Sequence, residues 1–428
     1  SDNDNVYIYI SGSSSVRSPG ELEGCSGVRP DQDPNSALFR IEVIKVPLAH
    51  PELAKIVSSP RIFEELAPPA RHGELEADAK VIAAARAARN IDRAKAAGIS
   101  LAALESLDST AAAVTAGRGP TQCHDITVYP SLGLAGGACG GYGLLLDIHD
   151  AAHPKRIAAA ADSNFSFWHS ATFNNDGTKI LFTDEWGGGT QPRCRSSDKY
   201  EWGADAIFAL VDGKMTFQSY YKMPAVQTPN ENCVAHNGTL IPIPGRDIMA
   251  QAWYQGGVSV FDWTDAAHPK EIAYYDRGPM DSTKMVMGGY WSTYWYNGYI
   301  VASEISRGLD IFQLKPSAFL SKNEIEAAKL VHFDYFNAQD QPKFTWPASF
   351  VVAHAYLDQL VRGSGVSRDV SSAISRDLAS AERADGTERK AALMRLANQL
   401  DTDAGAAADS RRVRAMATVV RALVDAQR

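Results

Sequence analysis

The sequence lacks any continuous apolar run near the roughly 20 residues that a membrane-spanning helix needs, so we expect no transmembrane segment. It also lacks an excess of positive charge, because 42 Lys and Arg stand against 50 Asp and Glu, a formal net charge of -8. Binding to a nucleic-acid backbone depends on clustered cations. The composition therefore predicts no nucleic-acid partner, and we expect a protein partner or self-assembly instead.

Common catalytic motifs are also missing. No Gly-x-Ser-x-Gly elbow occurs in the chain. The glycine-rich stretches at 136–141 and 187–189 do not lie between a strand and a helix, which is where a phosphate-binding loop lies. Motifs alone therefore leave the catalytic residues unknown.

Cysteine is scarce, with five in 428 residues. Cys123 and Cys139 are equidistant from the turn between them, so an antiparallel hairpin places them opposite each other. Cys194 lies in an insertion and Cys233 at the start of an inner strand, and we predict a second bond between these two. Cys25 has no obvious partner, and we expect its partner upstream. Two disulfides predict an extracytoplasmic location, and the alternative is five free thiols in a cytosolic protein.

A repeat of about 40 residues organises most of the chain, and residues 233–276 hold its most complete copy. Four short β-prone runs are separated here by turns rich in glycine, proline and aspartate. Four antiparallel strands in a repeat of this length are typical of a β-propeller blade. The expected strands are 236–243, 248–254, 258–263 and 271–275.

Turn residues align three more units with this copy. One opens at Cys123-His124 and another at Trp168-His169, and the last opens at Tyr290. Their expected strands are 126–129, 132–136, 143–148 and 155–161; then an inner strand from 168, 179–183, 205–211 and 215–222; then 290–296, 299–305, 308–314 and 329–335.

The earliest unit is incomplete. Residues 37–46 and 54–62 are expected as its third and fourth strands, and residues 1–12 match a second strand rather than a blade start. We therefore expect an innermost strand upstream of Ser1. The chain then holds four whole blades and a partial one, the C-terminal part of a ring of about seven.

Two segments are helical in pattern. Residues 64–119 are rich in alanine, with helices predicted over 74–90 and 92–107 and a start signal for the second helix at Ala97-Gly98-Ile99-Ser100. Residues after 346 carry four amphipathic stripes typical of a small bundle. The bundle has no Glu-x-x-His pattern, so we expect a packing or docking role. The predicted parts are a partial first blade (1–63), an Ala-rich helical insertion (64–119), four β-propeller blades (120–345) and a C-terminal helical bundle (346–428).

Three strands share a motif. Gly143–Ile148 reads GLLLDI, Gly257–Asp262 reads GVSVFD and Gly308–Phe312 reads GLDIF. On these motifs the chain resembles LVIVD repeat proteins, bacterial secreted or surface-associated β-propellers, over roughly residues 6–335 apart from the helical insertion. The resemblance implies a β-propeller fold and a location outside the cytoplasm. It supplies no catalytic residues, and the expected function is a binding or structural scaffold at the cell surface or in an extracellular assembly.

Histidine recurs at one position of three consecutive units. His124, His169 and His236 stand where an innermost strand begins, beside the channel of a propeller. Three imidazoles around one axis can bind zinc or copper and leave a coordination position open. Glu185 and Glu304 are possible additional ligands or hydrogen-bond acceptors in this hypothesis. The segment Phe167-Trp168-His169, followed by Thr183-Asp184-Glu185-Trp186, also resembles the selenium-binding protein and methanethiol oxidase propellers, in which histidines near the channel hold a metal.

A structural role is the alternative for these histidines, because repeated inner-strand residues often bond across blade interfaces. His50, His153 and His268 recur equally regularly in an outer turn, where we expect only a structural role. A metal-dependent oxidoreductase or hydrolase therefore stands as the alternative to the scaffold function.

Aromatic residues gather near the inner-strand positions. They are candidates for the lining of a ligand-binding mouth, and packing between blades is the alternative. The candidates are Trp168, Trp186, Trp253, Tyr254 and Trp291.

Overall fold

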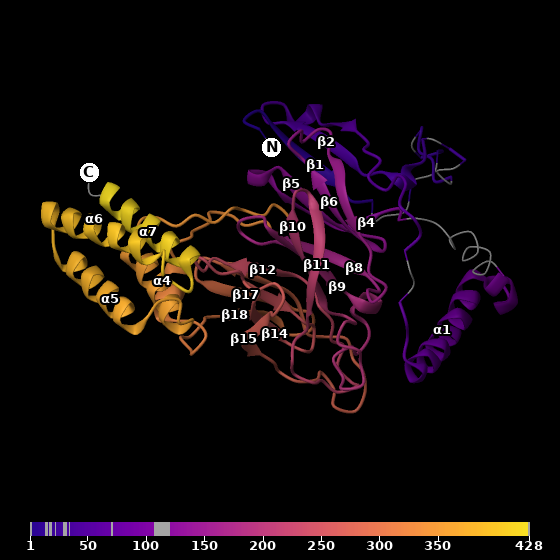
Figure 1. The fold of residues 1–428 in the computed structure, drawn as a ribbon. Helices are drawn as coiled ribbons and strands as arrows, with labels where there is room; N and C mark the ends of the chain where they lie inside the picture. The colour runs from indigo at the N-terminus through magenta and orange to yellow at the C-terminus, as the bar shows by residue number, and fades with distance from the viewer. Residues whose placement is uncertain are drawn as a thin grey trace. The chain divides into compact units, whose positions relative to one another are not determined.

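The fold is described from a computed structural model, which covers residues 2–12, 16, 19–21, 23–28, 32–33, 35–69, 72–106 and 120–426 (Figure 1). The described chain is mainly β, with several four-stranded antiparallel sheets and C-terminal helices. It divides into two compact units. Unit 1 comprises Ser1–Phe173, Ile180–His236 and Gln339–Gln341, and unit 2 comprises Asn174–Lys179, Asn237–Ala338 and Pro342–Arg428.

Unit 1 contains three antiparallel sheets. The first has three strands in the order β1-β2-β3, and the other two have four strands each, in the orders β4-β5-β6-β7 and β11-β10-β9-β8. Their bounds are β1 Asn5–Ile10, β2 Glu42–Pro47 and β3 Lys55–Ser58; β4 Cys123–Tyr129, β5 Leu134–Cys139, β6 Tyr142–Asp147 and β7 Lys155–Ala160; and β8 Trp168–Phe173, β9 Lys179–Asp184, β10 Asp205–Val211 and β11 Lys214–Tyr221.

The sheets of unit 1 pack through apolar faces. One core joins the first two sheets and includes Phe63 and Leu144, and the next joins the second and third sheets and includes Leu145 and Phe182. At Gly143 this packing leaves no room for a side chain, because a Cβ there would lie 2.5 Å from the Trp168 ring. Sequential sheets therefore bury each other's faces, as the repeat predicts.

Unit 2 contains two sheets and the helices that follow them. One sheet has the order β12-β13-β14-β15 and the other β16-β17-β18. Their bounds are β12 Gly238–Ile241, β13 Ile248–Ala252, β14 Val258–Asp262 and β15 Lys270–Tyr275; and β16 Tyr290–Tyr296, β17 Tyr299–Glu304 and β18 Gly308–Phe312.

The prediction that residues 329–335 form the fourth strand of the last sheet is wrong. The chain instead forms helix α3 (Lys322–Ala328), and residues 329–335 follow it without strand structure. A capping box starts this helix, because the Ser321 hydroxyl accepts a hydrogen bond from the Glu324 N–H while the Glu324 carboxylate accepts one from the Ser321 N–H. The Ser-x-x-Glu pattern was the signal that the strand prediction overlooked.

Four helices end the chain, in agreement with the predicted bundle. Their shared core includes Leu360, Leu378, Leu396 and Val420. Within unit 2 the first of them meets the β12–β13 turn, where the buried Gln359 side chain donates to the Pro244 carbonyl at 2.9 Å. The helices are α4 Phe350–Arg362, α5 Arg368–Arg383, α6 Gly386–Asp403 and α7 Ser410–Asp425.

The insertion forms a long helix and a short one, with the break between them where the Ala97–Ser100 start signal predicted it. Helix α1 runs unbroken over Glu76–Ala97 and ends at Gly98, which adopts the left-handed conformation with φ 66°. Only the predicted bound of the first helix at residue 90 is wrong, because no glycine or proline interrupts the helix near residue 91. A short helical segment follows at 101–106, and residues 107–119 of the predicted insertion lie outside the described residues.

The histidines of two outer turns make local contacts within the turn, in agreement with the structural role expected for them. In unit 1, His153 Nδ1 lies 2.9 Å from the carboxylate of Asp150, and in unit 2 His268 makes the same contact with Asp265. In both turns the imidazole and the carboxylate close the turn locally and are exposed.

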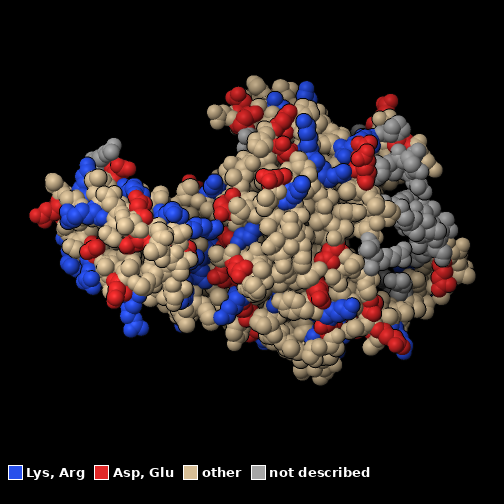
Figure 2. Space-filling model, viewed as in Figure 1, with Lys and Arg blue, Asp and Glu red and all other residues tan. Residues whose placement is uncertain are grey.

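The distribution of surface charge and the lengths of the apolar helices agree with what the composition predicts. On the face shown in Figure 2, cationic and anionic side chains are interspersed. None of the helices in the described part of the chain is both long and apolar enough to span a bilayer.

Glu324 is the central ion of a charged cluster in unit 2. Its side chain is 0% exposed and pairs with Arg246 at 2.8 Å and with Arg362 at 2.7 Å. Burial raises the pKa of Glu324, but the hydrogen bonds from Arg362 and the charge of Arg246 outweigh that effect and hold the pKa below its ordinary value. The carboxylate therefore stabilises unit 2 only while it is ionised.

We predict that Glu324→Gln lowers the free energy of unfolding of unit 2 by about 3 kcal/mol at pH 7, because two guanidinium groups lose their buried partner. Since the folded pKa lies below the unfolded one, this contribution is present above pH 4.5 and is lost as the pH falls further. Denaturant unfolding at pH 7 and at pH 4 tests it. The control is Glu326→Gln, which alters a half-buried pair with Lys329 that is far more accessible than Glu324. Equal effects of the two variants at pH 7 contradict the prediction.

Candidate metal centre

The three inner-strand histidines all belong to unit 1. His124 is the second residue of β4, His169 is the second residue of β8, and His236 lies two residues before β12. Two of these positions are β-bulges, because the register shifts between Cys123 and Asp125 and again between Trp168 and Ala171. A bulge re-aims side chains relative to a regular pleat.

The imidazoles converge instead of dispersing into separate sheets. Ring centroids lie 4.1 Å apart for His124 and His169, and 4.1 Å apart for His169 and His236. His169 is therefore the middle member of a continuous group of three rings.

Glu185 joins the two buried histidines. It follows directly after β9, and its carboxylate oxygens lie 3.7 Å from His169 Nε2 and 3.4 Å from His236 Nε2. The side chains are 3%, 9% and 0% exposed for His169, Glu185 and His236. Two ligands bound at 2.0–2.1 Å to one tetrahedral zinc ion lie about 3.3–3.4 Å apart. The observed separations are close to that spacing.

Burial controls the protonation of the middle histidine. Desolvation, followed by the neighbouring charges of His236 and His124, holds the pKa of His169 well below its usual value. Its Nδ1 atom is buried and has no hydrogen-bond partner among the described residues. His169 is thus a neutral imidazole, which is the form that binds a metal ion.

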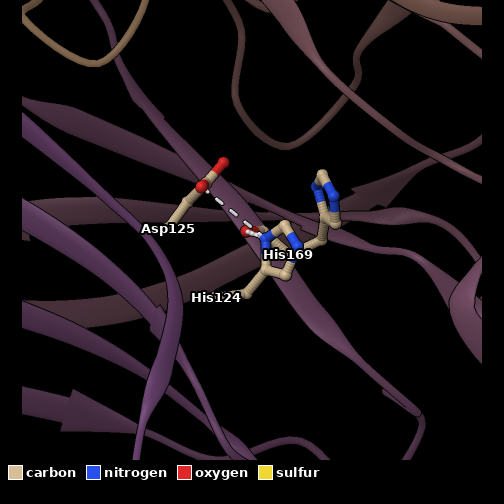
Figure 3. A group of neighbouring side chains, drawn as sticks. All are labelled: His124, Asp125 and His169. Carbon is tan, nitrogen blue, oxygen red and sulfur yellow. Dashed lines mark hydrogen bonds and ion pairs between the residues drawn. The ribbon is translucent and has the colours of Figure 1, made fainter. Parts of the chain in front are cut away.

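His124 and Asp125 form the open side of the cluster. The His124 side chain is 37% exposed, and its Nδ1 lies 3.6 Å from Asp125 Oδ1 and 3.1 Å from the carbonyl oxygen of His169 (Figure 3). Gln339, in a short segment that pairs beside β4, donates to Asp125 at 2.8 Å. Burial raises the pKa of Asp125. Sequence reasoning missed Asp125, although it adjoins a predicted ligand.

Two groups of side chains are therefore spaced closely enough to hold a metal ion. One is His169, Glu185 and His236, and the other is His124, Asp125 and His169. The first is fully buried and the second opens to solvent.

Asp184 anchors the backbone beside Glu185. Its two carboxylate oxygens accept hydrogen bonds from the N–H groups of Ser166, Phe167 and Gly203 at 2.9–3.0 Å. Burial raises the pKa of Asp184 to about 7, against the opposing effect of these backbone donors. The carboxylate thereby ties the end of β9 to the start of β8.

Glu304 does not belong to the cluster. It lies in unit 2, where its carboxylate accepts hydrogen bonds from the N–H groups of Gly289, Ser306 and Arg307. These hydrogen bonds close the turn after β17 and give Glu304 a structural role within unit 2, and the groups of metal-ligating side chains found among the described residues do not include it.

Most of the aromatic candidates are buried in packing. Trp168, Trp186, Trp253 and Tyr254 are each at most 2% exposed, whereas Trp291 is 50% exposed. Side chains so fully buried do not line an open mouth. Packing, the alternative use of these residues, describes the first four.

Both predicted disulfides are present, and each lies beside a site histidine. Cys123 bonds to Cys139 next to His124, and Cys194 bonds to Cys233 three residues before His236. Cys25 is a free thiol.

Comparisons with known proteins add no function. No protein-family model and no curated protein matches the chain. The solved structures that match include the computationally designed Ika4 protein, with 6% identity over 45% of this chain and 91% of that chain and a TM-score of 0.30. A protein from Bacteroides uniformis, described as a candidate 6-phosphogluconolactonase, has 12% identity over 46% and 51% and a TM-score of 0.32. A protein from Lactobacillus plantarum has 12% identity over 65% and 64% and a TM-score of 0.34. Similarities this low carry no argument.

The disulfide between Cys194 and Cys233 closes a separation of 39 residues. We predict that the double variant Cys194→Ser, Cys233→Ser lowers the free energy of unfolding of unit 1 by about 4 kcal/mol, because the cross-link restricts the unfolded chain. Denaturant unfolding under non-reducing conditions measures the loss. The comparison is the same double change at Cys123 and Cys139, which are separated by 16 residues, and we expect a smaller loss of unfolding free energy there. An unchanged denaturation midpoint in the Cys194→Ser, Cys233→Ser variant contradicts the prediction.

Proposed function

We propose that unit 1 binds a divalent transition metal ion through His169, Glu185 and His236, with His124 on the solvent side of the ion. The observation that carries this proposal is the buried carboxylate placed between two buried imidazole nitrogens, at 3.4 and 3.7 Å. Carboxylate and imidazole ligands in this combination suit zinc and are also used by copper.

The chemistry of the donors favours a metal over a purely structural cluster. A cation held between a buried carboxylate and two imidazoles compensates the buried negative charge. Both separations, 3.4 and 3.7 Å, are longer than the roughly 2.7–3.2 Å of a direct hydrogen bond between nitrogen and oxygen. The contacts are spaced for an ion between the side chains.

The asymmetry of the cluster points to an enzyme. Three protein ligands with a fourth position open to water or substrate are the arrangement of catalytic zinc sites, whereas structural sites are closed. The three-ligand group itself is buried, and His124, 37% exposed and in ring contact with His169, is its solvent-facing neighbour and a candidate proton-transfer group. A bound metal ion supplies Lewis acidity and an activated water molecule, so we propose a metal-dependent hydrolase or, with copper, an oxidoreductase.

We further propose that the five sheets are blades of an LVIVD-type β-propeller that works outside the cytoplasm. The support is the succession of antiparallel sheets joined by shared cores, together with the two disulfides.

A binding scaffold is the second candidate, and an apolar groove in unit 2 favours it. The groove has a volume of about 450 Å³ and is lined by side chains that include Val260, Ile272 and Phe312. Beside it the edge strand β18 exposes Leu309 and Ile311, which are 62% and 63% accessible. Exposed apolar side chains at an edge strand are a common feature of protein contacts.

Metal analysis of the purified protein tests the proposed centre. We predict about one equivalent of zinc or copper per chain. His169→Gln and His236→Gln should each lower metal affinity at least tenfold, because each removes one of three buried ligands. Elemental analysis after dialysis and calorimetric titration of the metal-free protein give the two readouts.

His153→Gln is the matched control, since His153 is an exposed histidine of the same unit and bonds only locally. It should bind metal as the wild type does. A wild-type protein that binds no zinc or copper, or site variants that bind as tightly as His153→Gln, contradicts the proposal and favours the scaffold.

A further inference from the structure

The loop at residues 186–202, here called the bridging loop, begins directly after Glu185. Trp186 opens it and is 1% exposed, and Trp202, at its far end, stacks on Trp186 with ring centroids 4.6 Å apart. The two ends of the loop are therefore held together beside one member of the proposed metal centre.

The same loop is also fastened to the segment that carries His236. Cys194 is bonded to Cys233, the Arg193 N–H donates to the Cys233 carbonyl at 3.1 Å, and the Asn232 side chain donates to the Gly189 carbonyl at 2.9 Å. The bridging loop thus connects the backbone of Glu185 with the backbone that leads to His236.

Arg193 ties this loop to the helical insertion. Its side chain is 0% exposed and lies over the Trp186 and Trp202 rings, at 4.8 and 5.7 Å from their centroids. The guanidinium donates to Glu74, just before α1, and to Asp78 in α1, the latter at 2.7 Å. A planar guanidinium can serve two carboxylates and two aromatic faces at once, which lysine cannot do.

Two further contacts strengthen this connection. Arg195 makes a two-pronged ion pair with Asp78, at 2.6 and 3.0 Å, and that bond holds the pKa of Asp78 below its usual value. His72 packs against Trp186 at 4.4 Å between ring centroids. The insertion therefore contacts the bridging loop through charge and through aromatic packing.

We propose that Arg193 is a positioning residue for the metal centre, an inference that rests on the proposed function. By clamping the bridging loop between α1 and the Cys233 segment, Arg193 fixes the distance between Glu185 and His236. The insertion then acts as an external support of the site, and neither Arg193 nor α1 touches the metal ion.

The test alters the helix side of the clamp, so that buried Arg193 stays in place. The double variant Glu74→Gln, Asp78→Asn removes the two carboxylates that the insertion presents to the guanidinium and leaves Asp198 at 3.7 Å. Glu76→Gln is the control on the same helix because Glu76 is 87% exposed. The probe is Co²⁺ added to the metal-free protein. Affinity is measured by titration, and ligand geometry by the visible absorption bands of the bound cobalt.

We expect the double variant to bind Co²⁺ about tenfold more weakly and with shifted absorption bands, as loss of support around ligands does, while Glu76→Gln matches the wild type. The absorption bands distinguish two explanations of weaker binding. A change in ligand positions shifts the bands of the cobalt-saturated protein, whereas a general loss of stability leaves them unchanged. Unchanged affinity and bands in the double variant overturn the positioning role while the metal centre stands. Failure of the wild type to bind Co²⁺ overturns both.

Discussion

A carboxylate shared by two buried imidazoles is the interaction on which the rest of unit 1 depends. Glu185, His169 and His236 come from three separate stretches of chain and are almost completely removed from water. Such groups are costly to bury unless each is paired. The surrounding structure therefore has to hold all three side chains in place, and much of unit 1 can be understood as that support.

Several independent devices provide the support. Bulges in β4 and β8 re-aim the strand starts that carry His124 and His169, and Asp184 fixes the backbone beside Glu185 through three N–H donors. The disulfide at Cys233 holds the approach to His236. Each device restrains a different side chain of the cluster, so several independent contacts fix the geometry of the proposed centre.

The sequence predicted the strands and the bundle well because both follow from simple periodicity. Strands such as β13 and helices such as α4 bury regular apolar faces, and the spacing of cysteines about a hairpin turn specifies which of them meet. The prediction was wrong where a local signal competed with the repeat. The capping box at Ser321 starts a helix where the fourth strand was expected.

Repetition also explains what could be predicted of the site. The three histidines could be predicted as a group because they occupy the same position in successive repeats. The role of Asp125 depends on a β-bulge, and the role of Arg193 depends on a contact with Asp78, which lies 115 residues away in the sequence. Such contacts have no signature in the local sequence. Only the folded structure shows that the insertion, the bridging loop and the histidines belong to one connected system.

X-ray absorption spectroscopy of the zinc-loaded protein tests the central claim most directly, because it reports the ligands around the ion. The account predicts a first shell of nitrogen and oxygen at 2.0–2.2 Å, with the multiple-scattering pattern of at least two imidazoles and a reduced imidazole signal in His236→Gln. A spectrum without imidazole scattering, or one that is identical in the wild type and His236→Gln, contradicts the account.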